Sequence, residues 1–167
     1  MWYVVQTLKG QEEKILDGIY RFVINSDEEA FIMLNEKMYK HHGKWETDRE
    51  NLFPGYLFVI TGEPAGFDQR LRKKYPLRKL LRVDGKITPI RTSEEEFLKT
   101  LGGESHIIRY SEGFRDGDKI VVESGALKGL SGKIKKLDRH NRQAVIALSL
   151  FGRETDVTLG LGIVKSI

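Results

Sequence analysis

Helical spacing of apolar residues is found in the first part of the chain and ends before Phe114. Three segments show it, residues 11–25, 66–75 and 93–103, and each predicts an amphipathic helix. From Phe114 onward the apolar residues come in short runs separated by glycine or polar turns, which is typical of strands. The sequence therefore predicts two domains of different class, the first with helices and strands and the second with strands alone.

The first domain is expected to alternate strands and helices. The predicted strands are residues 2–7, 30–40, 50–60 and 79–83, and a polar hairpin tip, 41–49, joins the second to the third. The helix predicted at 66–75 would bury Phe67 and Leu71 on one face, and a capping box formed by Ser93 and Glu96 would begin the last helix. The order β-α-β-β-α-β-α predicts a sheet with helices against it.

The second domain is expected to be a small barrel. Its predicted strands are residues 118–123, 131–138, 143–150, 154–160 and 162–167. Five short strands in so short a segment favour a closed all-β structure. We therefore place the first domain at residues 1–103, a polar connection at 104–112 and the barrel at 113–167.

Composition excludes several classes of function. The chain has no cysteine, so it has no disulfide, thiolate metal ligand or thiol nucleophile. Its N-terminal apolar run has no basic region before it and is interrupted by Lys9, so no signal peptide is predicted, and no run approaches membrane-spanning length. We expect a cytoplasmic protein without membrane contact. A net charge of +4 and a pI of about 9.2 indicate a polyanionic partner.

No group of residues in the sequence indicates catalysis. The histidines are scattered, and the glycines near residue 129 lack the Gly-Lys-Ser/Thr ending of a nucleotide-binding loop. His41 and His42, with Glu46 nearby, suggest a metal site, but adjacent histidines on a strand point to opposite faces, so we favour solvated turn residues. The sequence predicts a protein that is not an enzyme and has no cofactor or metal.

Four short motifs carry a family resemblance. They are "WYVVQT" at the start, "LFPGYLFV" in the middle, and "GALKGLSGKIKKLD" followed by "LFGRETDV" near the end. In their order and spacing, over nearly the whole chain, they resemble the NusG family of transcription elongation factors. The resemblance implies an α+β fold: an NGN domain, with an antiparallel sheet flanked by helices, that docks on RNA polymerase, followed by an SH3-like KOW barrel that recruits other partners. We expect a monomer.

The resemblance gives the motif "LFPGYLFV" a role in binding polymerase. In the family, aromatic residues around this motif grip the coiled-coil clamp helices of the largest polymerase subunit. Carried over here, the contact residues would be Phe53, Tyr56 and Phe58, with Pro54 and Gly55 shaping the backbone. Exposed aromatic clusters usually mark interfaces. The alternative is that alternate residues of the strand face the core. That alternative stays open for Phe58, whereas the interface is favoured for Phe53 and Tyr56.

A run of cations without an acid spans residues 70–82. It contains Arg70, Arg72, Lys73, Lys74, Arg78, Lys79 and Arg82. Each phosphate contact releases counterions, so such a run gives salt-sensitive affinity for nucleic acid. The alternative is a charged helix balanced by acids elsewhere, such as "SEEE" at 93–96. We favour nucleic acid.

A second basic cluster lies in the predicted barrel. It contains Lys128, Lys133, Lys135, Lys136, Arg139, His140, Asn141 and Arg142. Lys133 and Lys135 are expected to share one face of a strand, with Ile134 on the other. The tip "DRHNRQ" offers groups for phosphate contacts and for base-edge hydrogen bonds in structured RNA. From Glu112 onward, ten lysines and arginines oppose seven acids.

This charge favours a specialised paralog over the housekeeping factor. The chain resembles the LoaP type, which promotes terminator read-through at particular operons and is expected to recognise an RNA hairpin in the nascent leader transcript. Housekeeping members use the barrel mainly for proteins. There an exposed aromatic at the position of Phe151 can meet the termination factor Rho or a ribosomal protein. Phe151 is either such a contact or a core residue. For the whole chain, the alternatives to a specialised paralog are the housekeeping factor and a ribosome-associated RNA-binding protein that uses the barrel alone.

Overall fold

The chain forms two compact units, and each is built from two separate stretches of sequence. The computed structural model describes residues 1–166, with side chains through residue 164. Unit 1 comprises Met1–Met33 and Phe53–Glu95, and unit 2 comprises Leu34–Leu52 and Glu96–Ile167. The units differ from the expected domain limits because residues 34–52 belong with the C-terminal part of the chain. The limits at residues 103 and 113 stay a prediction.

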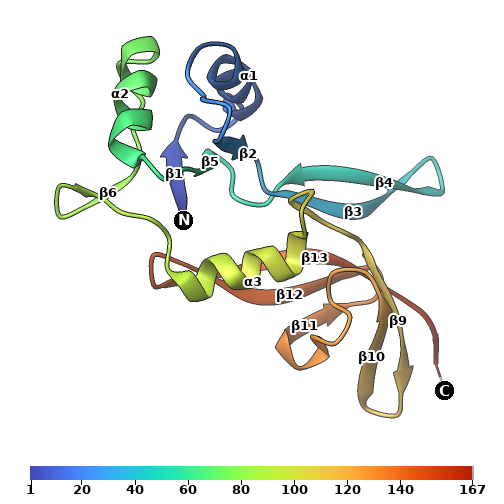
Figure 1. Ribbon diagram of the computed structural model, residues 1–167. Helices are drawn as coiled ribbons and strands as arrows, with labels where there is room; N and C mark the ends of the chain where they lie inside the picture. Colours follow the sequence, from blue (N-terminus) through green and yellow to red (C-terminus); the bar gives the residue numbers. More distant parts are fainter. Residues whose placement is uncertain (167) are drawn as a thin grey trace. The chain divides into compact units, whose positions relative to one another are not determined.

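Unit 1 contains a three-stranded antiparallel sheet in the order β1-β5-β2, together with helices and a short hairpin (Figure 1). Its elements are β1 (Trp2–Gln6), α1 (Glu12–Phe22), β2 (Glu29–Phe31), β5 (Tyr56–Ile60), α2 (Pro64–Lys74), β6 (Arg82–Val83) and β7 (Lys86–Ile87). Helix α3 (Thr92–Gly102) begins in unit 1 and ends in unit 2. The predicted combination of sheet and helices is confirmed.

The core of unit 1 is rich in aromatic residues. Trp2 and Phe58 are buried in the sheet, with their ring centroids 5.8 Å apart. Phe67 and Leu71 of α2 are both fully buried, as the helical spacing predicted. Helices α1 and α2 approach closely at Gly18, where a Cβ atom would lie 1.6 Å from the hydroxyl oxygen of Tyr75. Only glycine leaves room for this contact.

Helix α3 begins before the predicted N-cap, Ser93, and its N-cap residue, Arg91, has no side-chain oxygen to complete a capping box. The helix begins at Thr92, and the Arg91 N–H donates a hydrogen bond of 2.9 Å to the Glu94 carboxylate. The expected pairing of Ser93 with Glu96 is therefore wrong by two residues, because Glu94 occupies the third helical position.

Unit 2 contains a five-stranded sheet in the order β10-β9-β13-β12-β11, whose neighbours are antiparallel except for the parallel pair β13 and β9 (Figure 1). Its strands are β3 (Leu34–His41), β4 (Lys44–Asn51), β8 (Ile107–Ile108), β9 (Ser111–Asp116), β10 (Lys119–Ser124), β11 (Ile134–Asp138), β12 (Gln143–Leu150) and β13 (Arg153–Ser166), and a 3-10 helix, η1 (Ser131–Lys133), precedes β11. Unit 2 also contains the end of α3, but from β9 onward the described chain consists of strands and η1, so the predicted β structure of the C-terminal part is confirmed.

Two strand assignments differ from those expected in unit 2. Residues 154–160 and 162–167 were predicted as two strands, but residues 153–166 form the single strand β13. The end of the second prediction, Ile167, lies outside the described residues. Strand β9 of the same sheet was not predicted, and it begins inside the segment expected to be a polar connection, 104–112. Gly160 and Gly162 do not interrupt β13 in the way that the sequence suggested.

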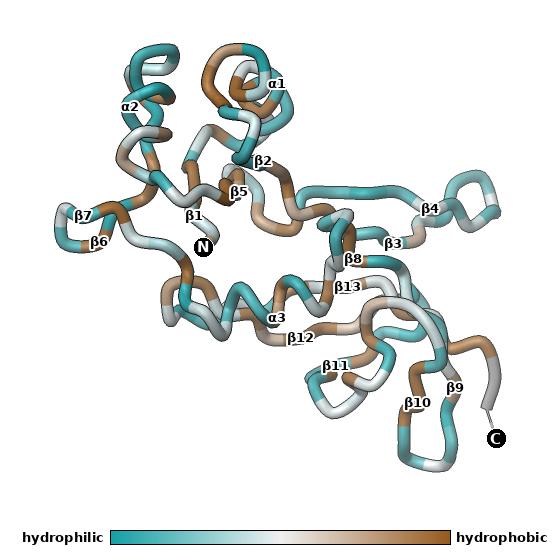
Figure 2. Tube along the Cα trace, in the orientation of Figure 1, coloured by the Kyte–Doolittle hydropathy of each residue, from teal (hydrophilic) through white to brown (hydrophobic). Residues whose placement is uncertain are grey.

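Unit 2 also contains a long hairpin from the first half of the sequence. The segment predicted as a single strand at 30–40 divides, because β2 pairs with β5 whereas β3 pairs with β4 and β8. The expected tip at 41–49 is mostly strand. A two-residue turn, His42 and Gly43 with φ of 49° and 78°, joins β3 to β4, as in turns that need positive φ at both positions. Figure 2 shows that β4 is hydrophilic along its length.

Candidate functional site

The motif "LFPGYLFV" contains a tight turn in unit 1. The Tyr56 N–H donates to the Phe53 carbonyl at 3.0 Å, and Gly55 has a φ of 87°. Proline followed by a glycine with positive φ is the pattern of a type II turn. The Thr7 N–H donates to the Gly55 carbonyl at 2.7 Å, and the Gly55 N–H donates to the buried Glu12 carboxylate at 3.2 Å. The turn is therefore held from both sides.

The aromatic rings of this motif divide between core and surface. Phe58 is fully buried, stacked on Phe31 at 5.5 Å between ring centroids, and Phe53 is 9% exposed with its ring 5.7 Å from that of Phe58. Pro54 is exposed and Tyr56 is half-buried. Of the predicted polymerase-binding residues, Pro54 and Tyr56 thus reach the surface, whereas Phe53 and Phe58 lie in the core. Their role in binding stays a prediction.

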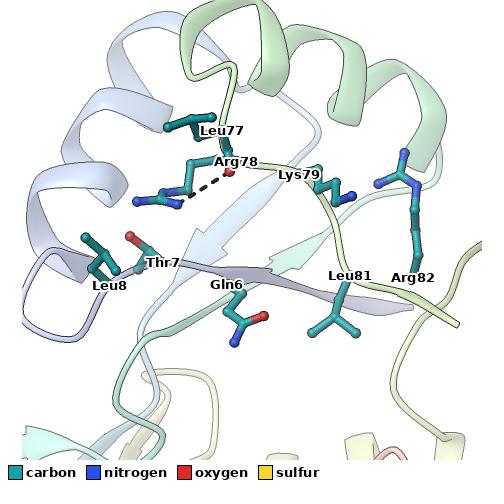
Figure 3. Close-up of a pocket in the computed structure, with 8 residues that line it drawn as sticks. All are labelled: Gln6, Thr7, Leu8, Leu77, Arg78, Lys79, Leu81 and Arg82. Atoms are coloured by element: carbon teal, nitrogen blue, oxygen red, sulfur yellow. Dashed lines mark hydrogen bonds between the residues drawn. The ribbon is translucent and has the colours of Figure 1, made fainter.

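A groove of about 490 Å³ opens on unit 1. Its lining residues are Gln6, Thr7, Leu8, Leu77, Arg78, Lys79, Leu81 and Arg82. Leu8 and Leu77 are 66% and 87% exposed, so two apolar side chains of the groove face solvent. Arg78 extends toward Thr7 and Leu8 (Figure 3). The sequence did not predict the groove, because these leucines are far apart in the sequence and stand among polar residues.

The arginines of the 70–82 run are mostly engaged with acids. Arg70 forms an ion pair with Glu28 and donates to the Val23 carbonyl at 2.8 Å. Arg72 and Arg82 both pair with the buried Asp68, at 3.2 and 2.7 Å. The acids that balance these arginines are thus Glu28 and Asp68, not the expected acids of 93–96.

Asp68 is the centre of that network. Burial by itself raises the pKa of this carboxyl, but hydrogen bonds from Arg82 and from the Leu80 N–H, with the charges of Arg82 and Arg72, together hold the pKa of Asp68 below its ordinary value. The Leu80 N–H donates at 2.8 Å. The carboxylate is therefore charged near neutral pH and fixes the segment that follows α2.

The lysines of the same run differ from the arginines. Lys73 and Lys79 are exposed, and no ion pair forms at either within the described residues. The Lys74 ammonium lies 4.0 Å from the centre of the exposed Phe22 ring, a cation–π contact. The prediction of nucleic-acid binding for this run stays untested, and the lysines are its most accessible members.

The barrel cluster is exposed on unit 2. Its exposed members are Lys128, Lys133, Lys135, Lys136, Arg139, His140 and Asn141. Lys133 lies in η1 and not on the strand, so the expected pairing of Lys133 with Lys135 on one strand face is wrong. A bulge between Ile134 and Lys136 leaves both Lys135 and Lys136 exposed. Lys135 pairs with Asp156 at 2.7 Å, and this hydrogen bond raises the pKa of the lysine.

The loop that joins β11 to β12 is ordered by its own side chains. Asp138 accepts hydrogen bonds from the backbone N–H of Asn141 at 3.1 Å and from its Nδ2 at 2.8 Å, which lower the pKa of Asp138. All three of Arg139, His140 and Asn141 are exposed, but Asn141 is held by its hydrogen bonds to Asp138. Arg142, with a φ of 54°, is half-buried and places its guanidinium 4.3 Å from the centre of the Trp45 ring.

Phe151 lies at the turn between β12 and β13. It has a φ of 53° and is followed by Gly152 at 76°, so the two residues form the hairpin turn that follows the pair of Leu150 and Arg153. Phe151 is half-buried. Both roles considered for it, as a protein contact and as a core residue, stay open.

The histidines of the hairpin do not form a metal site in the part of the chain that the structure describes. His42 occupies the turn, and no cluster of three or more His, Cys, Asp or Glu residues with the geometry to hold a metal ion is found there. Within residues 1–166, no helix is long and apolar enough to cross a membrane.

The fold defines a two-part α+β protein, and both parts carry exposed cations. A family model described as transcription termination factor nusG matches residues 1–99. The chain belongs to the NusG family of transcription termination and antitermination factors.

Curated relatives match over nearly their whole length. The transcription termination/antitermination protein NusG of Thermus thermophilus is 27% identical, covering 95% of this chain and 94% of the relative. The protein of the same name from Bacillus subtilis is also 27% identical, with 95% and 93% covered. A solved structure described as "Domain interaction in Thermotoga maritima NusG" has a TM-score of 0.50 and 22% identity, covering 95% of this chain and 92% of that one. The similarity to this solved structure shows a shared fold only.

Proposed function

We propose that the chain is a specialised antitermination factor of the LoaP type. It binds RNA polymerase through its N-terminal part and a hairpin of the nascent leader transcript through its barrel, and it thereby promotes read-through of terminators. The observation that carries the proposal is the row of exposed cations along η1, β11 and the loop that follows. Lys133, Lys136 and Arg139 are its clearest members.

The acids near this row offset only part of its charge. Asp156 pairs with Lys135, and Asp138, whose pKa is lowered chiefly by two hydrogen bonds from Asn141, is the other acid beside a row of four cations, Lys133, Lys135, Lys136 and Arg139. Neighbouring exposed cations in excess over acids favour a polyanion, since each phosphate that they neutralise releases counterions. Structured RNA suits the site because phosphates and hydroxyls along a duplex are regularly spaced.

The contact with polymerase rests on the surface of unit 1. Pro54 and Tyr56 reach the surface from a turn held by Thr7 and Glu12, so their positions are fixed before binding. In this proposal they contact the clamp helices of the largest subunit. The groove with exposed Leu8 offers a further apolar contact for a protein segment. The mechanism is tethering: RNA bound by the barrel raises the local concentration of the factor at polymerase.

The second candidate is the housekeeping factor, whose barrel binds proteins. The observation that favours it is the position of Phe151 at a hairpin turn, where an aromatic ring is accessible to a partner. Weak RNA binding that ignores RNA structure would favour this candidate.

Binding of the full chain to RNA stem-loops tests the proposal. Affinity is measured across a salt series, with single-stranded and scrambled RNAs as competitors. Replacing Lys136 and Arg139 together by alanine is expected to weaken stem-loop binding by about 10-fold or more and to reduce the salt slope by roughly two. The matched control replaces Arg115 and Lys119, exposed cations of β9 and β10, and is expected to bind nearly as wild type. Equal losses in both variants would mean non-specific attraction and would contradict the proposal.

A further inference from the structure

The hairpin of β3 and β4 lies against the barrel within unit 2. The Nδ2 of the buried Asn35 donates to the Thr158 carbonyl of β13 at 2.8 Å. At Gly160 the two backbones approach so closely that a Cβ atom would lie 2.7 Å from the Glu36 carbonyl oxygen. The Glu36 carboxylate also pairs with Arg109 at 3.6 Å. The first residues of β3 are therefore docked on β13.

The hairpin segregates its charges between its two faces. Cross-strand pairs alternate in direction, so Glu36 and Arg49, Met38 and Thr47, and Lys40 and Trp45 fall on one face, which we name the Trp45 face. Lys37 and Asp48, Tyr39 and Glu46, and His41 and Lys44 fall on the other, which we name the Lys44 face. The acids of β4 thus all lie on the Lys44 face. There Glu50 pairs with Lys37 and accepts the Tyr39 hydroxyl at 2.9 Å.

The Trp45 face keeps little negative charge. Among the residues of β3 and β4, its single acid is Glu36, which pairs with Arg49 at 3.3 Å and accepts the Tyr110 N–H at 3.2 Å. Lys40 is exposed, and its ammonium lies 5.9 Å from the centre of the Trp45 ring. The end of this face near the turn is therefore basic.

Arg142 joins that basic end to the loop of the barrel. Its guanidinium lies over the Trp45 ring at 4.3 Å and also donates to the sulfur of Met38 at 3.7 Å. A guanidinium stacked on an aromatic ring keeps its donors at the ring edge available to other acceptors. The contact brings Arg142, at the end of that loop, to the same ring that Lys40 approaches, although 102 positions separate Lys40 from Arg142 in the sequence.

We infer that the Trp45 face of the hairpin is the second half of the RNA-binding surface. Trp45 is a positioning residue that holds Arg142, and Lys40 supplies a further contact to phosphate. The inference rests on the proposed function of the barrel and extends it to a segment that lies outside the barrel sequence. The partner is an RNA stem, because a surface of several cations spread over two hairpins matches regularly spaced phosphates.

The experiment uses the full chain and one defined probe: the stem-loop RNA that the wild-type protein enriches from a randomised stem-loop pool. A DNA duplex of the same length is the competitor. Trp45→Ala is expected to weaken binding by roughly 3- to 30-fold, the range of a lost cation–π contact, and Trp45→Phe is expected to restore most of the affinity. Since Trp45→Ala leaves the net charge unchanged, general attraction does not explain such a loss.

Lysine variants of the same hairpin supply the matched control. Lys40→Ala is expected to weaken binding by about 3- to 10-fold and to reduce the salt slope by roughly one. Lys44→Ala removes the same charge from the opposite face and is expected to change affinity by less than about 2-fold. Unchanged far-ultraviolet circular dichroism and thermal unfolding establish that each variant is folded.

The outcomes separate this inference from the proposed function. If Trp45→Ala and Lys40→Ala bind as wild type while the double variant at Lys136 and Arg139 loses affinity, the hairpin is not part of the surface and the barrel proposal stands. If no variant loses affinity, both fail. Equal losses at Lys40 and Lys44 would also overturn the inference, as would equal competition by the DNA duplex.

Discussion

The carboxylate of Asp68 lies 2.7 Å from the guanidinium of Arg82, and it is 2% exposed while Arg82 is 22% exposed. This pair connects α2 to the segment that follows it, because the same carboxylate accepts the Leu80 N–H. Leu80 in turn bridges to Val5 of β1. A helix, a loop and the edge of the sheet in unit 1 therefore depend on one buried charge.

Asp68→Asn is expected to destabilise the protein by about 2 to 4 kcal/mol, because it leaves Arg82 and Arg72 facing a neutral group. Urea unfolding of both proteins at neutral pH measures the difference. Asp17→Asn removes the partner of Arg21 in an exposed pair and serves as the control, with an expected effect below about 1 kcal/mol. Similar losses in the two variants would contradict a special role for Asp68.

The same pair gives the stability a defined pH dependence. The pKa of Asp68 is lowered in the folded state, so its contribution is present above the unfolded pKa of about 4 and is lost as the pH falls through the folded value. The stability difference between wild type and Asp68→Asn should be constant above about pH 5 and shrink below about pH 4. A stability difference that grows on acidification would contradict a lowered pKa of Asp68 in the folded state.

Phe58 and Tyr56 are expected to respond to alanine in opposite ways. Phe58→Ala empties a fully buried site and should cost about 3 to 5 kcal/mol of stability. Tyr56→Ala should leave stability within about 1 kcal/mol of wild type and weaken polymerase binding by about 10-fold or more. The measurements are thermal unfolding and binding to core RNA polymerase. Phe22→Ala, at another exposed ring of unit 1, is the control for binding, and a loss there as large as that of Tyr56→Ala would refute a specific contact.

Gly160→Ala is expected to disturb the docking of the hairpin on β13. The new Cβ would lie 2.7 Å from the Glu36 carbonyl oxygen, so the backbones must separate, at a cost of about 1 to 3 kcal/mol. Gly132→Ala has open space around the new atom and should leave stability unchanged or slightly raised. Urea unfolding compares the two variants, and equal stability would show that the close approach does not matter.

Strong periodicity explains which elements of the fold were predictable. In α2 the spacing of Phe67 and Leu71 matched one helical face, and both are buried. The strand predicted at 143–150 is β12, where the buried residues Ala144, Ile146 and Leu148 alternate with half-buried ones. In both elements the packing follows the period of the backbone, so local pattern suffices.

Weakly periodic strands were missed for a physical reason. Strand β9 buries Ser111 and Gly113, small residues whose type gives no hydrophobic signal, and a Cβ at Gly113 would collide with the Val121 carbonyl at 2.3 Å. Strand β4 is almost entirely exposed and polar, so it is ordered by pairing with β3 and not by burial. Gly160 and Gly162 suggested a break in the strand, but they are glycines because neighbouring parts of the chain approach β13 too closely for a Cβ atom.

In the candidate surfaces, too, local features were predictable from the sequence and long-range contacts were not. The exposed position of the barrel cations followed from their polarity, and the pair of Asp68 with Arg72 follows from their i, i+4 spacing. The partners Glu28 for Arg70 and Trp45 for Arg142 lie 42 and 97 positions away. No local pattern marks such pairs, because tertiary folding brings them together.

The hydrogen bond between Asn35 and the Thr158 carbonyl joins residues that are 123 positions apart, so it cannot form until most of the nascent chain has been synthesised. At translation rates of roughly 5 to 20 residues per second, β3 would leave the ribosome on the order of 6 to 25 seconds before its partner in β13 exists. Until β8 has also emerged, the hairpin has only its own cross-strand pairs and a polar surface. A strand that waits for its partner is exposed to wrong pairings, and the polar, charged residues of β3 and β4 protect it from aggregation during synthesis.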